Sequence, residues 1–167
     1  MIVVSDTTPL ITLMKVGKLS ILHSLFGEVQ IPEAVFSEAT GNETFKDEAD
    51  IIRKSEYIRV VEVRDHRQVE FLQRVTGLDL GESEAIIYAD ENKADLLLMD
   101  EAAGRKVAQN MNLPITGSVG ILLRAYKSGI ITVDDADDAF DRIKRANRHI
   151  SEPLINKALE ILHSERE

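Results

Sequence analysis

Short apolar segments alternate with longer amphipathic ones along most of this chain, a pattern typical of an α/β fold. Residues 2–5 begin with three β-branched side chains, and residues 96–99 form a continuous apolar run. A run without polar alternation indicates a strand buried on both faces of a parallel sheet. Further strand patterns cover residues 29–31, 58–63 and 114–116, and we expect residues 58–63 to form an exposed or edge strand.

Apolar positions at helical spacing predict helices between and after these strands. Thr8 is the expected N-cap of the first helix, with Pro9 at its first position. Together the elements predict a three-layer α/β/α domain with a mostly parallel sheet over residues 1–131. A helical hairpin is expected over residues 132–167, packed on the same domain or on a partner. The helices are expected over residues 9–16, 19–25, 42–53, 67–75, 81–92, 102–111, 118–127, 134–148 and 151–164, with one more that starts at Pro32.

Composition narrows the class of protein. The 167 residues are 44% apolar, which suits a single globular domain. The sequence has neither the long apolar run of a membrane helix nor the basic-then-apolar order of a secretory signal, so we expect a soluble, cytoplasmic protein. The absence of cysteine excludes disulfides, thiolate nucleophiles and cysteine metal sites.

The formal charge of −9 is unusual for a protein that binds nucleic acid, because phosphate contacts normally require a basic surface. A hydrolase that works through divalent cations, however, needs a local surplus of carboxylates, and its cations supply the positive charge that meets phosphate. The acidic balance is therefore compatible with a nucleic-acid hydrolase without indicating one.

Two acids follow apolar strands directly. Asp6 comes after residues 2–5, and Asp100 after residues 96–99. In an open parallel sheet the functional crevice lies at the carboxyl ends of the strands, so both acids are candidates for one site. The alternative for each is that it only caps the helix that follows.

Glu82 and Glu84 near the start of the helix over residues 81–92 are further candidates. Residues two apart on a helix point about 200° away from each other, so both cannot face one small site. Glu82 shares its face with Ile86 and Ala89, which are expected to pack on the sheet, whereas Glu84 shares its face with Tyr88. This favours Glu82 as the inward acid. The alternative is that both acids only stabilise the first helical turn.

The order of four segments resembles the PIN-domain nucleases, among them the toxin-like ribonucleases of prokaryotic toxin–antitoxin pairs and their less characterised relatives. The likeness runs from residue 2 to about residue 131, and a fifth segment looks like the closing strand-to-helix turn of one subgroup. The four segments are VVSDTTPL at 3–10, IPEAVFSE at 31–38, GESEAIIYA at 81–89 and LLMDE at 97–101, and the fifth is TGSVGIL at 116–122.

This resemblance implies a ribonuclease that hydrolyses RNA with Mg²⁺ or Mn²⁺, forms homodimers and, in toxin members, binds a small antitoxin whose tail enters the acidic groove. Glu84 stays an alternative third acid, because many members have an acid followed directly by Ala and an aliphatic residue. Ser118 matches a hydroxyl position that could hold a carboxylate or water, unless it is a plain N-cap. The four implied metal-binding and catalytic acids are Asp6, Glu38, Glu82 and Asp100.

Other classes fit less well. A phosphatase with an aspartate nucleophile usually has Asp-x-Asp after the first strand, and residue 8 is Thr. A phospho-receiver domain would need adjacent acids there and a lysine after a late strand. No histidine pair has metal-ligand spacing, which disfavours a zinc hydrolase. A PIN-fold binding module with weak catalysis stays open. The four histidines are His23, His66, His149 and His163.

Basic residues are the remaining candidates for contact with RNA. Arg105 and Lys106, just beyond Asp100, are well placed to meet a phosphate. A second group is close in sequence but spreads around its helix, which favours a solvated face over an RNA-contacting patch. This group consists of Arg142, Lys144, Arg145 and Arg148.

Overall fold

The computed structural model describes residues 1–41, 46–146 and 150–165, and within these ranges five strands form one sheet in the order β3-β2-β1-β4-β5. Every pairing between neighbouring strands is parallel, which confirms the predicted α/β class. The segment predicted to be exposed or an edge strand is β3, at one edge of the sheet. The strands are β1 (Val3–Ser5), β2 (Val29–Pro32), β3 (Ile58–Val61), β4 (Leu96–Leu98) and β5 (Ile115–Thr116).

The helices follow the predicted ones with shifted ends. Among the described residues, none of them has the length and apolar character required to cross a membrane. Residues 42–45 of the predicted helix 42–53, and residues 147–149 with Arg148 and His149, lie outside the described residues. The helices are α1 (Thr7–Lys15), α2 (Ile21–Phe26), α3 (Glu33–Thr40), α4 (Lys46–Lys54), α5 (His66–Thr76), α6 (Leu80–Glu91), α7 (Ala102–Asn110), α8 (Ser118–Lys127), α9 (Val133–Ala146) and α10 (Glu152–Ser164).

The start of α1 corrects the prediction for Thr8 and Pro9. Asp6, not Thr8, is the N-cap, with extended backbone angles (φ −78°, ψ 172°). Pro9 then falls in the first turn, where its missing N–H costs no helical hydrogen bond. The helix therefore begins directly after β1, and the acid stands at the junction of strand and helix.

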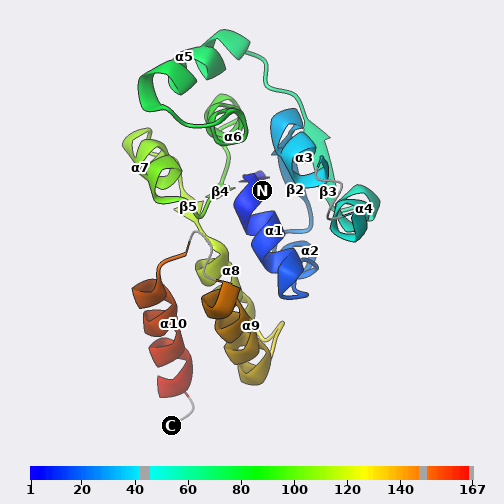
Figure 1. Cartoon of the computed structure of the whole chain (residues 1–167), viewed down its shortest axis with the longest axis vertical. Coiled ribbons are helices and arrows are strands. Elements are labelled where there is room, and N and C mark those ends of the chain that lie inside the picture. The colour runs from blue at the N-terminus through cyan, green and yellow to red at the C-terminus, as the bar shows by residue number, and fades with distance from the viewer. Residues whose placement is uncertain (42–45, 147–149, 166–167) are drawn as a thin grey trace.

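Helices cover both faces of the sheet, with α6 on one side and α1 and α8 on the other (Figure 1). The buried side chains of strands and helices form one large apolar cluster around the sheet, from Val3 in β1 to Leu97 in β4. Phe140 of α9 and Leu162 of α10 belong to the same cluster, since both helices pack on α8. Ile155, Ala158 and Leu162 of α10 are thus buried by the rest of the chain, whereas Leu154 near its start is 48% exposed.

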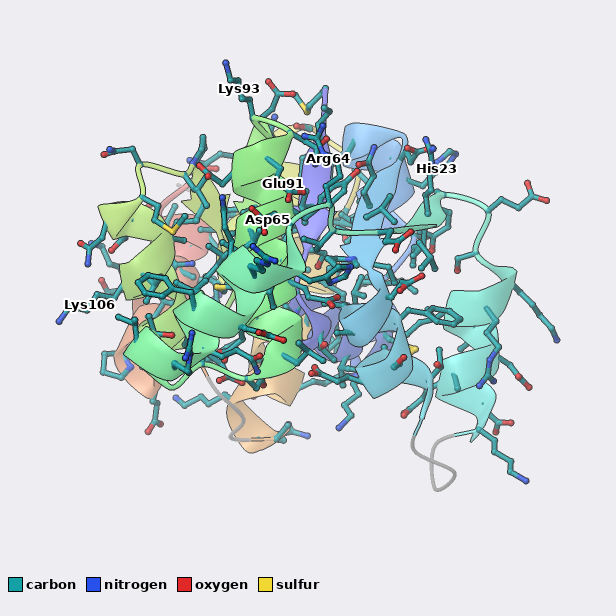
Figure 2. The ribbon with its side chains drawn as sticks, turned by 90° about the horizontal axis from the view of Figure 1, so that it is seen from above. His23, Arg64, Asp65, Glu91, Lys93 and Lys106 are labelled. Atoms are coloured by element: carbon teal, nitrogen blue, oxygen red, sulfur yellow. The ribbon has the colours of Figure 1, made fainter. Side chains whose placement is uncertain are left out.

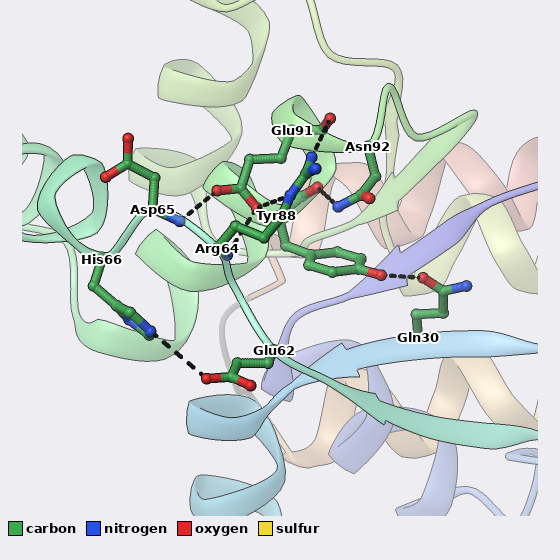
Figure 3. Close-up of polar contacts among 8 residues, drawn as sticks. All are labelled: Gln30, Glu62, Arg64, Asp65, His66, Tyr88, Glu91 and Asn92. Atoms are coloured by element: carbon green, nitrogen blue, oxygen red, sulfur yellow. Dashed lines mark hydrogen bonds and ion pairs between the residues drawn. The ribbon is translucent and has the colours of Figure 1, made fainter.

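Both ends of α6 are anchored, which matters because this helix carries Glu82. At its carboxyl end, Glu91 accepts hydrogen bonds from the backbone N–H groups of Arg64 (3.1 Å) and Asp65 (2.8 Å) (Figure 3). The Tyr88 hydroxyl donates to Gln30 of β2 at 2.6 Å. These contacts fix α6 against the sheet and against the start of α5, so the amino end of α6 has a defined position.

Candidate carboxylate site

Asp6 lies at the carboxyl end of the central strand β1. Its backbone N–H donates to the Leu98 carbonyl at 3.0 Å, which extends the pairing with β4 by one residue. The side chain is only 2% exposed. Burial raises the pKa of Asp6 to about 8, a hydrogen bond from the Thr7 backbone opposes this, and nearby Glu82, Asp79 and Glu38 raise it further. The acid therefore sits among other carboxylates rather than beside a cation.

Glu38 approaches the same place from α3. Its Oε2 accepts a hydrogen bond from the Thr7 hydroxyl at 2.7 Å, and its Oε1 accepts from the backbone N–H of Gly81 at 3.1 Å. A Cβ at position 81 would lie 2.6 Å from both carboxylate oxygens, so only glycine leaves room for this approach. Burial raises the pKa of Glu38, the Thr7 hydroxyl lowers it, and Asp79 raises it again.

Glu82 is held by the first turn of α6. Asp79 is the N-cap and accepts from the Glu82 backbone N–H at 2.8 Å, while the Glu82 Oε2 accepts from the Asp79 backbone N–H at 3.0 Å. This reciprocal capping box leaves Oε1, which is buried and has no hydrogen-bond partner among the described residues. Burial, followed by the repulsion of Asp79 and Glu101, raises the pKa of Glu82 to about 7, against the opposing hydrogen bond from the Asp79 backbone.

Glu101 is a fourth acid at this place. It is the N-cap of α7, and its Oε1 accepts from the Thr8 hydroxyl at 3.3 Å. Ionised carboxyl groups only accept hydrogen bonds, so Glu101 offers Glu82 no donor, and its negative charge raises the pKa of Glu82. Two ionised carboxylates this close repel each other, and either a proton or a cation reduces that repulsion.

Asp100 is turned to a different partner. Its Oδ1 accepts from the backbone N–H of Ser118 at 2.7 Å, and its Oδ2 accepts from the Ser118 hydroxyl at 2.6 Å. Ser118 is thus not the N-cap of α8, which is Gly117, but the fully buried donor to Asp100. Asp100 also lines a cleft of about 510 Å³ with Arg105 and Lys106. Lys106 points outward from α7 (Figure 2).

Glu84 lies on another face of α6. It is buried, contrary to the expected outward position, because α6 is covered by α3 and α5 as well as by the sheet. Its Oε2 accepts from the backbone N–H of Ala34 at 3.0 Å, in the first turn of α3. This carboxylate therefore supplies an acceptor that the amino end of α3 needs.

The donor set suits a hard divalent cation. Asp6, Glu38, Glu82 and Glu101 offer only carboxylate oxygens, the ligands that Mg²⁺ and Mn²⁺ prefer. The unpartnered Oε1 of Glu82 is an acceptor without a donor in a buried place, which a cation would satisfy. Within residues 1–41, 46–146 and 150–165, however, no three acids or histidines are arranged to hold one ion as they stand. The threonine partners of Glu38 and Glu101 would have to be exchanged.

Not all of the acids predicted from the sequence lie together in the structure. The structure brings three of the predicted acids, Asp6, Glu38 and Glu82, to one place and turns Asp100 toward Ser118. Sequence reasoning missed Asp79 and Glu101. Both carried a signal, since Asp79 stands three residues before Glu82 in the capping-box spacing, and Glu101 is the second acid after β4.

Comparison with known families gives one assignment. A family model described as a PIN domain matches residues 2–164. The match includes α9 and α10 as well as the sheet and the carboxylate site. A search of curated proteins found no match.

Proposed function

This chain belongs to the PIN-domain family, and from that premise we propose that it is a divalent-cation-dependent ribonuclease that hydrolyses RNA phosphodiester bonds. The observation that carries the proposal is the meeting of Asp6, Glu38 and Glu82 at the carboxyl end of β1, where burial and repulsion from neighbouring carboxylates raise the pKa of each. A folded protein keeps such repulsion where a ligand relieves it, and function is the usual reason.

Mg²⁺ or Mn²⁺ would be held by the buried carboxylates of Asp6 and Glu82, with Glu38 and Glu101 as the other donors. A divalent cation bound there would lower the pKa of a nearby water and neutralise charge on the phosphoryl oxygens. The chain itself contributes orientation: Thr7 bonds to Glu38, and Thr8 bonds to Glu101. The burial of Asp6 strengthens the electrostatic interaction of its own carboxylate with a bound cation.

We assign the fourth carboxylate of the site to Glu101 in place of Asp100. Glu101 acts directly on the pKa of Glu82, whereas both Asp100 oxygens are occupied by Ser118. In this arrangement Asp100 is a positioning residue that ties the β4–α7 turn to the start of α8. Arg105 and Lys106, in the same cleft as Asp100, are available to the RNA backbone next to the site.

The test is cleavage of a fluorescent single-stranded RNA in Mg²⁺, in Mn²⁺ and in EDTA. Wild type is expected to cleave with either cation, EDTA to abolish cleavage, and Asp6→Asn to reduce it at least about 100-fold. Asp90→Asn, an exposed change on α6, is the matched control and is expected to cleave like wild type. Cleavage in EDTA, or by Asp6→Asn at the wild-type rate, contradicts the proposal.

A second candidate is a PIN-fold binding module with weak catalysis, which the hydroxyl bonds of Glu38 and Glu101 favour because they compete with a cation. The same RNA assay separates the two, since a module would bind RNA or a partner protein without cation-dependent cleavage. Action as the toxin of a toxin–antitoxin pair, a small antitoxin partner and homodimer formation are further proposals that rest on the family resemblance alone.

A further inference from the structure

A groove of about 410 Å³ runs between α1 and α9, which lie on the same side of the sheet (Figure 1). Its volume lies within the range typical of small-molecule sites, about 300–1,000 Å³. The groove begins at Thr7 and Thr8, the two residues whose hydroxyls hold Glu38 and Glu101. Thr7 and Thr8 therefore belong both to the groove and to the surroundings of the carboxylate site. Its lining residues are Thr7, Thr8, Ile11, Thr12, Lys15, Val16, Arg142, Ile143, Arg145 and Ala146.

The direction of α9 places basic side chains at the carboxylate end of this groove. Lys18, just past the end of α1, pairs with Asp135 in the first turn of α9 at 3.5 Å. The two helices thus run antiparallel, so the last turns of α9 with Arg142 and Arg145 lie beside the start of α1. None of the described residues that line the groove is acidic, although the whole chain carries a net charge of −9.

Arg142 and Arg145 form exposed ion pairs, which a phosphate can replace. Arg142 pairs with Asp138 at 3.1 Å, and Arg145 pairs with Asp141, each one helical turn away along α9. All four side chains of these pairs are more than half exposed, and exposed pairs of this kind contribute little to stability. Each of these ion pairs is formed through one arginine nitrogen, Nε of Arg142 and Nη2 of Arg145, whereas a phosphate can accept two parallel hydrogen bonds from one guanidinium.

We propose that the α1–α9 groove is a nucleotide subsite, which takes the one nucleotide of a single-stranded RNA that adjoins the phosphodiester at the carboxylate site. The base lies on the apolar floor formed by Val16 and Ile143, and the adjacent phosphate is bound by Arg142 and Arg145. This inference rests on the proposed ribonuclease function. Charge complementarity selects RNA as the occupant, because the groove that carries these cations shares Thr7 and Thr8 with a site whose ligand is a polyanion.

The experiment is RNA binding by fluorescence anisotropy, measured on Asp6→Asn in Mg²⁺ so that the RNA stays intact. A labelled eight-nucleotide RNA is compared with eight derivatives, each of which lacks one base. One position is expected to matter, with a loss of affinity of about tenfold, the size of one base contact. Thr12→Phe, which fills the groove, is expected to abolish the difference between that abasic RNA and the intact one.

A surface variant gives a second, independent readout. Arg142→Gln with Arg145→Gln is expected to weaken RNA binding about tenfold and to reduce the slope of log affinity against log salt by about one to two. Arg53→Gln is the matched control, because Arg53 has the same kind of exposed ion pair, with Asp50 of α4. Thermal unfolding of each variant shows whether it is folded. If Thr12→Phe does not fold, RNA binding by the Arg142→Gln, Arg145→Gln double variant still tests the subsite.

The outcomes separate this proposal from the function on which it rests. If wild type cleaves RNA but the arginine pair binds RNA as Arg53→Gln does, the subsite is refuted and the ribonuclease remains. If every abasic position costs the same in both backgrounds, the base does not enter the groove and the subsite is again refuted. If no variant of the chain cleaves RNA yet the position-specific loss and its removal by Thr12→Phe are seen, the subsite stands and the ribonuclease fails.

Discussion

Replacement of Asp6 by Asn is expected to stabilise the cation-free protein while it removes cleavage. Burial beside other carboxylates raises the pKa of Asp6 from 3.8 to about 8, so near neutral pH the folded protein keeps this carboxyl largely protonated, whereas the unfolded chain ionises it. The folded state therefore binds this proton more tightly than the unfolded chain. The contribution of Asp6 to stability is complete below pH 3.8 and is lost as the pH rises toward 8.

The size of this effect follows from the two pKa values. The linkage relation gives a cost of roughly 5 kcal/mol at pH 7.5 and roughly 2 kcal/mol at pH 5. These values are ceilings, because the Asn amide brings N–H donors that need partners of their own. We expect a gain of about 1–3 kcal/mol at pH 7.5, or about 3–10 °C in Tm for a chain of this length. Glu82, with a pKa raised to about 7, adds a pH slope of the same sign.

The assay is thermal and urea unfolding of both proteins in EDTA from pH 5 to pH 8.5. Wild type is expected to lose stability across this range more steeply than Asp6→Asn, and Mg²⁺ or Mn²⁺ is expected to restore wild type more than the variant. Asp90→Asn serves as control and should stay within about 0.5 kcal/mol of wild type. The reasoning is refuted if Asp6→Asn is no more stable than wild type at pH 7.5, or if both proteins show the same pH dependence.

Three further substitutions test the other parts of the site. Glu101→Gln is expected to weaken Mn²⁺ binding about tenfold or more in calorimetry, and Asp100→Asn to weaken it by less than about threefold. A larger loss of affinity in Asp100→Asn than in Glu101→Gln would restore Asp100 as the fourth ligand. Gly81→Ala puts a Cβ 2.6 Å from the Glu38 carboxylate. It is expected to slow RNA cleavage about 10–100-fold with little change in the free energy of unfolding. An unchanged cleavage rate would contradict the role given to Glu38. Glu84→Met leaves the Ala34 amide of α3 without its acceptor and should lower the free energy of unfolding in urea by about 1–3 kcal/mol. Glu84→Gln keeps an acceptor and should lower it less. RNA cleavage per folded molecule should be unchanged in both variants.

Most of the fold could be read from the sequence because its strands are nearly pure apolar runs. Val3 and Val4, and likewise Leu97 and Leu98, are fully buried in the centre of the sheet. A run with no polar alternation leaves few alternatives to a covered parallel strand. Helix ends were less predictable, since Thr8 and Asp6 are both good N-cap residues and only the backbone geometry after β1 decides between them.

The site was less readable, for two physical reasons. Asp100 and Glu101 are neighbours in a turn, and the backbone angles of that turn decide which side chain lies beside Glu82. Glu84 was expected on an outward face because a helix that packs on a sheet usually buries one stripe. The cover of α3 and α5 over α6 buries its second face too, and periodicity within α6 contains no information about those helices.

The most direct test of a shared cation site is anomalous diffraction from a crystal soaked in Mn²⁺. A manganese peak is expected in contact with the carboxylates of Asp6 and Glu82, with Glu101 nearby and Asp100 still bonded to Ser118. A peak held by Asp100 and remote from Glu82, or no peak at all beside Asp6 at saturating Mn²⁺, would contradict a shared cation site.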